Sequence, residues 1–375
     1  MRRTGLIGSP FFRLRTLCGN SILFLALFVG CWVHAQETDL LRIGLLLPDS
    51  SAQEARYGAE FAVEEANRHG GIRGRNIELL TRSMEGPWGQ GSKEAVDLVF
   101  EEKVWAILGT HEGRNAHLVE QVIAKTQILF VSAWAADPTL SQAFVPWYFS
   151  CVPNSDRQAE ALVGLIREKP FQRWALVGER DYDSRIAAEA LQRKAGKIDA
   201  KNLTRIYFEG PKDMGRILEE IRKTKSQAIL LLGNPPLSTQ LIRHLRSNGQ
   251  EQPVYGTLSL LGEKAFAKST PNDLRAAYAL SSGFWKVSDK PSFFAGFRKK
   301  FGRNPGAMAV YAYDGARLLL QAIRESGPDR EKLRQAMTEM RFEGLTGTIR
   351  FDDKGNRLGL PVIVPMDDEI FFQNP

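Results

Sequence analysis

Three residues carry side chains that a zinc enzyme uses: His111, Glu112 and His117. In the zinc motif H-E-x-x-H the second histidine lies four positions after the first, so that both face one side of a helix. Here the second histidine lies six positions after the first, and two side chains at that spacing do not share a helix face. The spacing therefore predicts no metal site at these residues.

The glycine-rich stretch Gly86–Lys93, GPWGQGSK, superficially resembles a phosphate-binding loop. Such a loop follows the pattern G-x-x-x-x-G-K-[ST], whereas this stretch has a different spacing and places Ser92 before Lys93. We interpret it as a turn, with Ser92 as the N-cap of the following helix. The nucleophile motif G-x-S-x-G does not occur. The sequence thus predicts a protein that is not an enzyme, with no catalytic residue, metal or cofactor.

Two polar loops, Thr110–Asn115 and Ser132–Pro138, are the stretches around which we expect function to be organised. Each follows a short apolar run, Val104–Leu108 and Ile128–Val131, and the helical pattern Ala116–Ala124 lies between them. Two buried runs joined by a helix form a βαβ unit, whose following loops lie side by side at one edge of a parallel sheet. Open α/β sheets bind ligands at this edge, so these loops are the predicted binding site.

The same alternation of apolar runs and helical patterns continues over most of the chain. One series precedes Pro153 and a second follows it, each more than 100 residues long. This alternation is typical of parallel sheets, and we predict an α/β fold of two doubly wound parallel-sheet lobes. Further predicted strands are Leu41–Leu47, Ile77–Thr81, Tyr148–Val152, Arg173–Val177, Thr204–Phe208, Ala228–Leu232 and Val254–Thr257. Ala277–Gly283 is a further strand or a hinge, and Gly344–Phe351 and Leu360–Val364 form a terminal hairpin.

The first 35 residues have the composition of a targeting segment. They contain four arginines and no acid, followed by the apolar run Ser21–Val33 and the small-x-small pattern Val33-His34-Ala35. We predict that residues 1–35 are a signal peptide and that the protein is exported to the periplasm. The apolar run is shorter than the roughly 20 residues of a membrane span. An alternative is a lipoprotein anchored through Cys31, because Phe28-Val29-Gly30-Cys31 is close to a lipobox.

The charge and the cysteine content of the chain argue against a nucleic-acid-binding protein and against a protein held together by internal disulfides. Without residues 1–35 the net charge falls from +7 to +3, and we find no clustered basic face, so we expect no nucleic-acid partner. Cys18 and Cys31 lie in the targeting segment, which leaves Cys151 alone and allows no internal disulfide. Cys151 lies in an apolar stretch and is predicted to be a buried, inert thiol.

Several pieces of the chain, taken in order, resemble one known family. They are IGLLLPDSS, GAEFAVEEANRHGGIRGRNIELL, ILGTHEGRNA, FVSAWAADPTL, YAYDGARLLLQAI and FEGLTGTIRFDDKGNR. Together they are similar to the periplasmic Leu/Ile/Val-binding protein family, the type I solute-binding proteins of ABC importers. The resemblance implies a monomer with two lobes joined by a three-crossover hinge, which closes on a small solute and delivers it to an ABC permease in the inner membrane. It also implies lobe boundaries at residues 40–152 plus 284–327 and 153–283 plus 328–375.

The resemblance also implies ligand-binding positions. In the family, a residue with a hydroxyl group contacts the ligand carboxylate, and its position corresponds to Gly113 or Arg114 in this chain. The second loop contributes Trp134, Ala135 and Ala136. From the other lobe, Tyr182 matches a tyrosine that covers the ligand. The family's acidic residue, which pairs with an amino group, falls near Leu258 or Ser259, where this chain has no acid.

These departures alter the expected solute. An ammonium group in a closed cleft needs a carboxylate or several acceptors, because burying it unpaired is costly. A plain branched-chain amino acid is therefore a poor candidate. We expect another small solute (amino-acid-like, a carboxylate or an aromatic acid), with Arg114 on the anion and Trp88, Trp134 and Tyr182 around the apolar part. If leucine binds, an acid such as Asp181 or Glu263 must pair with it.

Three alternatives remain open at this point. Arg114 could be a surface residue that caps the following segment, and Trp134 could pack in the core. The whole chain could also be a sensory module of the same fold, which signals to a membrane receptor instead of feeding a permease.

Overall fold

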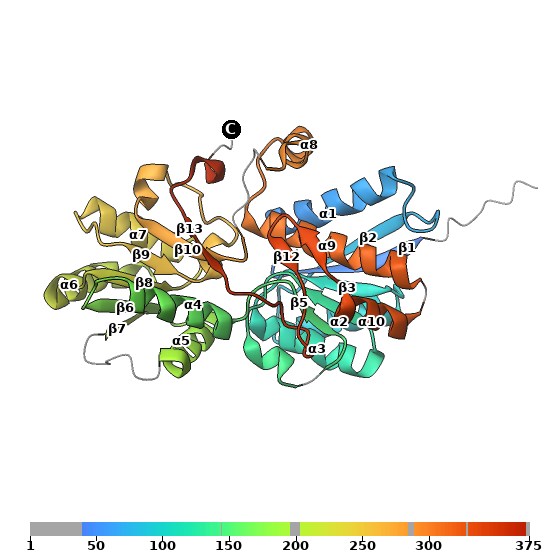
Figure 1. The fold of residues 1–375 in the computed structure, drawn as a ribbon, viewed down its shortest axis with the longest axis horizontal. Helices are drawn as coiled ribbons and strands as arrows, with labels where there is room; N and C mark the ends of the chain where they lie inside the picture. The colour runs from blue at the N-terminus through green and yellow to red at the C-terminus, as the bar shows by residue number, and fades with distance from the viewer. Residues whose placement is uncertain (1–39, 144, 196–202, 284–288, 328, 373–375) are drawn as a thin grey trace, which may run out of the picture. The chain divides into compact units, whose positions relative to one another are not determined.

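The structure is a computed structural model that describes residues 40–143, 145–195, 203–283, 289–327 and 329–372. The predicted signal peptide and Cys31 lie outside the described residues. Within them, the strands form two large sheets and one small one, and Figure 1 shows the order of the elements along the chain. We call each large sheet, with the helices that pack on it, a lobe.

The first lobe contains five parallel strands in the order β2-β1-β3-β4-β5. The central strands β3 and β4 are buried along their whole length, as expected for apolar runs covered on both faces. The strands are β1 (Leu41–Leu47), β2 (Ile77–Ser83), β3 (Ala106–Gly109), β4 (Leu129–Ser132) and β5 (Tyr148–Ser150).

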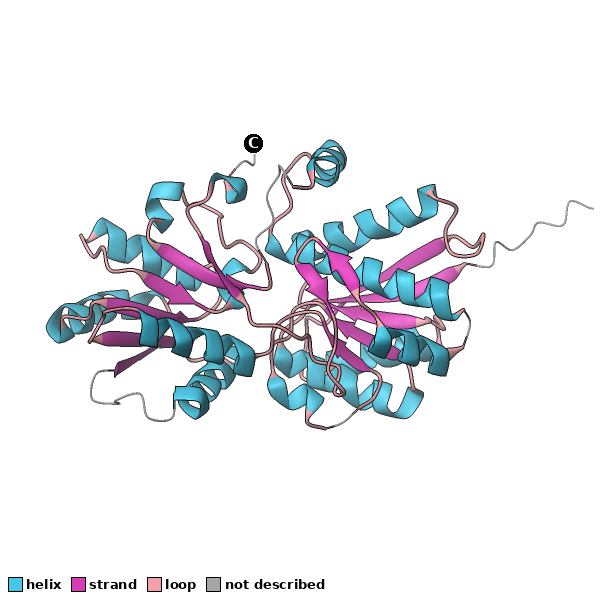
Figure 2. Ribbon diagram, viewed as in Figure 1, coloured by secondary structure: helices cyan, strands magenta, loops and turns pink. Residues whose placement is uncertain are grey.

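Helices cover both faces of this sheet (Figure 2). The helices α1 (Gln53–Arg68) and α9 (Ala307–Ser326) pack on each other and on one face, and α2 (Gln90–Phe100) and α3 (Gly113–Thr126) cover the other. The helix α8 (Pro291–Phe301) joins α1 through edge-to-face contacts of Phe61 with Phe293 and Phe297. Such aromatic pairs add to the area that they bury.

The second lobe is a six-stranded sheet in the order β13-β10-β9-β8-β6-β7. All its neighbouring strands run parallel except β13, which is antiparallel to β10. Its strands are β6 (Trp174–Glu179), β7 (Leu203–Phe208), β8 (Ala228–Leu232), β9 (Val254–Gly256), β10 (Ala277–Ser281) and β13 (Val362–Pro365). Its helices are α4 (Ser155–Glu168) and α5 (Tyr182–Ala195) on one face, and α6 (Met214–Thr224) and α7 (Leu237–Ser247) on the other.

Short 3-10 helices occupy several loops. They are η1 (Pro138–Ser141), η3 (Pro211–Asp213), η4 (Leu258–Leu261), η5 (Pro271–Leu274) and η6 (Glu369–Phe371). The predicted fold of two doubly wound lobes is confirmed, and the strands differ from prediction mainly at their ends.

The terminal hairpin is the clear error of the sequence analysis. The strand β12 (Gly347–Ile349) pairs with β11 (Phe342–Gly344), whereas β13 pairs with β10 in the second lobe. The preceding helix α10 (Arg330–Glu339) packs on α9 and β4, and Asp314 of α9 accepts the backbone N–H groups of Leu345 and Thr346. These contacts place residues 330–349 beside the first sheet, although we expected residues 328–375 in the second lobe.

The chain passes between the lobes after β5, after β10 and between β12 and β13. The first and third passages are hydrogen-bonded to each other: Ser150 donates its N–H to Gly355 at 2.8 Å, and the buried Arg357 donates to the carbonyl of Cys151 at 2.7 Å. Gly355 has φ +77, and a Cβ there would lie 2.1 Å from the carbonyl of Tyr148, so only glycine fits. The two passages therefore form one bonded ribbon at the hinge.

Candidate functional site

The two predicted loops lie at the carboxyl ends of β3 and β4, and both contact the second lobe. The N–H of Gly113, at the first position of α3, donates to Asp183 Oδ1 at 3.2 Å and lies 3.5 Å from Oδ2. Asp183 belongs to the first turn of α5, and α3 and α5 also pack against each other. The N-terminus of a helix in one lobe thus holds a carboxylate from the other.

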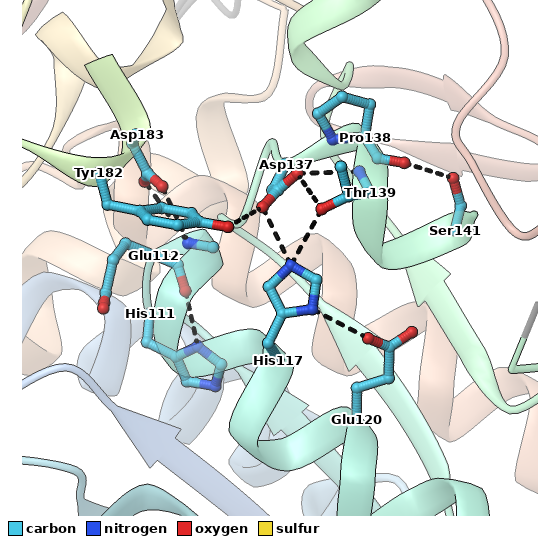
Figure 3. A network of polar contacts seen from close by, with 11 residues as sticks. His111, Glu112, His117, Glu120, Asp137, Pro138, Thr139, Ser141, Tyr182 and Asp183 are labelled. Atoms are coloured by element: carbon cyan, nitrogen blue, oxygen red, sulfur yellow. Dashed lines mark hydrogen bonds and ion pairs between the residues drawn. The ribbon is translucent and has the colours of Figure 1, made fainter. Parts of the chain in front are cut away.

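The neighbouring residue makes a second contact between the lobes. The hydroxyl of Tyr182 donates to Asp137 Oδ2 at 2.7 Å, and Asp137 lies in the loop after β4 (Figure 3). The bond ties the start of α5 to the second predicted loop. Tyr182 therefore lies at the boundary between the lobes, and its contact with a ligand stays a prediction.

His117 supports Asp137 from within the first lobe. Its Nε2 lies 3.0 Å from both Asp137 Oδ2 and Thr139 Oγ1, and its Nδ1 lies 3.1 Å from Glu120 Oε2. Hydrogen bonds to Asp137 and Glu120 raise the pKa of His117 to about 9. Burial would raise the pKa of Asp137, but hydrogen bonds from His117, Thr139 and Tyr182 lower it to about 2. At neutral pH the charged imidazolium of His117 therefore forms an ion pair with the carboxylate of Asp137.

Asp183 lies in a less favourable electrostatic environment. Burial raises its pKa to about 7, and the charges of Glu112 and Asp181 act in the same direction. The hydrogen bond from the Gly113 N–H opposes them only in part. The contact between Asp183 and α3 therefore holds a carboxylate against repulsion from its neighbours.

A second helix of the first lobe is capped in the same way. Both carboxylate oxygens of Glu263, from the second lobe, lie 3.2 Å from the N–H of Glu54 in the first turn of α1. Burial and the nearby Glu263 raise the pKa of Glu54 to about 8, although Arg303 lies 3.4 Å from Glu54 Oε1. Lys264 adds a bond of 2.9 Å to Ser51 Oγ.

These groups line a cavity of about 530 Å³ between residues of the two lobes. Phe266 and Phe371, stacked at 4.4 Å between ring centres, form part of its wall. The wall also carries the two acids Glu54 and Glu263 and the two basic residues Arg303 and Lys264.

Trp134 occupies a position between the lobes. Its ring packs edge-on against Tyr311 of α9 with 5.9 Å between ring centres. A Cβ on Gly262, in the loop after β9, would lie 3.6 Å from Trp134 Cζ2. Trp134 is half-buried, so it is in part a packing residue, as one alternative held.

Three other predicted positions already have partners within the protein. The N–H of Ala135 donates to Ser132 Oγ at 3.1 Å, and the side chain of Ala135 is buried in the core. The carbonyl of Ala136 accepts the N–H of Ser155 at 2.7 Å. The hydroxyl of Ser259 donates to the carbonyl of Gly233 at 3.1 Å. A ligand that used these groups would have to replace the internal bonds.

Arg114 and Trp88 lie together, but on an exposed surface. The guanidinium carbon of Arg114 lies 4.2 Å from the centre of the Trp88 ring, and Trp88 is 66% exposed. The two side chains form a cation–π pair. Arg114 directly follows Gly113, whose N–H contacts the second lobe. Ser92, which we expected to be an N-cap, lies inside α2, whose N-cap is Gly89 with φ +96, and donates to the carbonyl of Leu118 at 3.3 Å.

The pair His111 and Glu112 forms no catalytic arrangement. His111 is fully buried, stacks on Phe130 with 5.9 Å between ring centres, and burial lowers its pKa. Cys151 is also buried, and burial raises the pKa of its thiol to about 12, as expected for an inert cysteine. Among residues that the structure describes, no group of three or more His, Cys, Asp or Glu is arranged to hold a metal ion.

Sequence reasoning missed Asp137, Asp183 and Glu54 as parts of this region. Asp181 and Asp183 flank Tyr182 just before a helix, where acids are usually taken for N-caps. Asp181 does bond the N–H of Ser184 at 3.0 Å, whereas Asp183 turns to the other lobe. The only signal in the sequence was that two acids, Asp181 and Asp183, occur where the helix needs one N-cap residue.

No helix in the described ranges has both the length and the apolar character that a membrane span requires.

Comparison with known proteins identifies the family. Residues 41–364 match the sequence model of a family described as periplasmic binding protein. The leucine-, isoleucine-, valine-, threonine-, and alanine-binding protein of Pseudomonas aeruginosa is 21% identical over 353 residues, covering 90% of this chain and 92% of that protein.

Solved structures agree on the fold. The branched-chain amino acid transporter substrate-binding protein LivJ of Streptococcus pneumoniae, solved with isoleucine, has a TM-score of 0.76 at 21% identity, covering 85% of this chain and 93% of that chain. A solute-binding protein of an ABC transporter from R. palustris, solved with benzoate, has a TM-score of 0.74 at 16% identity. The match covers 88% of this chain and 96% of that chain. The match over residues 41–364 shows that this chain belongs to the periplasmic binding protein family.

Proposed function

We propose that this protein is the exported substrate-binding protein of an ABC importer. It traps a small solute between its lobes by hinge closure and delivers it to a permease in the inner membrane. The observation that carries the proposal is the pair of bonds from Tyr182 and Asp183 to the loops after β3 and β4. These bonds join the ligand-binding edges of two open α/β sheets.

Such bonds are what a closing receptor requires. A ligand shifts a two-state equilibrium only by binding one state better than the other. Contacts between the lobes form in the closed state alone, so they set how much solute binding energy closure needs. The ribbon formed by Ser150, Cys151, Gly355 and Arg357 is the element about which we propose that the lobes rotate.

The solute class is an amino-acid-like compound, a carboxylate or an aromatic acid. Two of the related structures hold isoleucine and benzoate, which share a carboxylate. We propose Gly113, Trp134 and Tyr182 as contacts, with Arg114 and Trp88 at the exposed end of the site and Ala135, Ala136 and Ser259 beside it. We also propose that the first lobe includes, beyond the expected residues 40–152 and 284–327, the described residues 329–349, because α10 and β11 pack on α9.

The export of the chain is part of the same proposal. Residues 1–35 serve as the signal peptide, with anchoring through Cys31 as the less favoured route, and the mature protein acts as a periplasmic monomer.

A thermal-shift screen tests the function directly. The purified protein is heated with leucine, isoleucine, benzoate, short-chain acids and their amides. A solute that binds only the folded state raises the melting temperature by mass action. Stabilisation by acids but not by their amides supports the proposed class. The absence of any shift across the panel at millimolar concentration would contradict it.

A further inference from the structure

A separate cavity of about 410 Å³ lies on the first lobe. Residues of α1, α9 and β11 line it, and Figure 1 shows α1 and α9 side by side. Its apolar wall includes Ala62 and Ala66 of α1, Phe293 of α8 and Leu320 of α9. The volume falls in the range of small-molecule sites, and none of the predicted ligand-binding residues lines the cavity.

Arg317 of α9 lines this cavity and is oriented by two aromatic rings. Its guanidinium carbon lies 5.4 Å from the centre of the Tyr313 ring and 5.4 Å from that of the Phe342 ring. Both rings are buried in the core of the lobe, whereas Arg317 is exposed. Cation–π contacts hold a guanidinium in place, but they do not satisfy its five N–H donors.

The basic groups of the cavity outnumber its acids. The basic residues Lys290, Arg317 and Arg324 line it together with the acids Glu65 and Glu343. Within the ranges that the structure describes, neither Arg317 nor Arg324 forms an ion pair or donates a side-chain hydrogen bond. A concave surface with a surplus of one charge attracts ligands of the opposite charge.

Both acids of the cavity already have hydrogen-bond donors from the protein. Glu65 Oε2 accepts the hydroxyl of Tyr313 at 2.5 Å. Glu343 Oε1 accepts Nε of Arg341 at 3.2 Å, and its Oε2 accepts the hydroxyl of Thr348 at 2.9 Å. The guanidinium donors at the cavity wall are therefore left for an acceptor from outside the chain.

We propose that this cavity binds a small soluble anion with two or more negative charges, a polycarboxylate or a phosphate. Arg317 offers paired N–H donors to one carboxylate or phosphate group, and Arg324 and Lys290 supply charge for the second. The cavity is lined by the first lobe alone, so the anion does not bridge the lobes and does not bias closure. This inference does not depend on the proposed function.

Titration calorimetry with citrate and with inorganic phosphate tests the site, at constant ionic strength because salt screens exposed charges. We expect saturable binding by the wild type, weakened about tenfold or more in Arg317→Gln, the scale of a charged hydrogen bond. Arg317→Lys keeps the charge without the paired donors and should bind with intermediate affinity.

Arg56→Gln is the matched control, and we expect it to bind both anions as the wild type does. The guanidinium of Arg56 also lies over a ring, 5.3 Å from the centre of Tyr57, but it pairs with Glu60 and does not line the cavity. Melting temperatures without anion show that each variant is folded.

Two results would overturn the proposal. One is the absence of saturable binding of either anion by the wild type at millimolar concentration, even if the protein sediments with vesicles of phosphatidylglycerol. The other is equal binding by the wild type and Arg317→Gln, which would place the anion elsewhere. Arg317→Gln is expected to keep the thermal shift given by the solute of the screen above, so failure of this site is distinguishable from failure of the proposed function.

Discussion

The hydroxyl of Tyr182 and the carboxylate of Asp137 join the two lobes through a bond of 2.7 Å. The same carboxylate oxygen accepts from His117 at 3.0 Å, so the imidazole of one lobe and the phenol of the other share one acceptor. This arrangement couples the electrostatics of the first lobe to its contact with the second lobe.

Replacing Tyr182 by Phe removes the bond while keeping the ring. Because a hydrogen bond to a charged group contributes about 1.5–3 kcal/mol, we expect solute affinity to fall about 10-fold or more. Calorimetry with the best solute of the screen measures it. Tyr207→Phe, on the same lobe but exposed, serves as the control. An unchanged affinity for Tyr182→Phe would show that the bond plays no part in capture.

Replacing Arg114 by Ala tests its proposed contact with an anion. We expect binding of benzoate to weaken by about 1.5–3 kcal/mol, the range for a charged hydrogen bond. Trp88→Ala is the companion variant, since it leaves the guanidinium without the ring on which it packs. If Arg114→Ala binds benzoate as the wild type does, Arg114 is only a surface partner of Trp88.

The protonation of His117 makes the free energy of unfolding depend on pH between 6.5 and about 9. Its pKa is raised from 6.5 to about 9, so the folded state binds a proton that the unfolded state has lost in this range. The stabilisation is complete below pH 6.5 and disappears as the pH rises through 9. Melting temperatures measured over this range should fall for the wild type relative to His117→Gln. Parallel curves for the two proteins would contradict the assignment.

Glu54 makes stability depend on pH in a lower range. Burial and Glu263 raise its pKa from 4.5 to about 8, with Arg303 acting in the opposite direction. The folded state keeps the proton that the unfolded state loses, so stability falls as the pH rises from 4.5 to 8. Glu54→Gln should flatten this part of the profile, as read by urea unfolding at several pH values. A profile as steep as that of the wild type rules out Glu54 as its cause.

Asp314 is expected to stabilise the fold rather than the site. It is fully buried and accepts three hydrogen bonds, from the N–H groups of Leu345 and Thr346 and from Thr346 Oγ1. Asp314→Ala leaves these donors unpaired and should lower the free energy of unfolding by about 3 kcal/mol. Asp353→Ala, in an exposed turn, should change it by less than about 0.5 kcal/mol. Urea unfolding measures both, and equal values would disprove the role.

The sequence determined the fold class because its signal is local. Apolar runs such as Ile128–Val131 and helical patterns such as Ala116–Ala124 depend on neighbours within one element, and the structure contains strands and helices at both places. The edge at which the loops of β3 and β4 lie follows from the parallel order alone. The family resemblance rests on the same local pieces.

Pairing between distant segments was decided by the tertiary structure. The strand β13 follows a turn that suits a hairpin, yet it pairs with β10, where its buried Val364 lies opposite the buried Ala279. The segment after α9 packs on the first lobe because Asp314 needs donors in the core.

The sequence also could not predict the contacts between distant segments that form the candidate site. The family resemblance pointed to Gly113, Trp134 and Tyr182 as ligand-binding positions, which remain predictions. That resemblance could not show that Asp183 would reach the N–H of Gly113 or that Glu263 would cap α1, since these contacts exist only when the two lobes meet. Burial and charge at an interface depend on both surfaces at once, and one stretch of sequence describes only one of them.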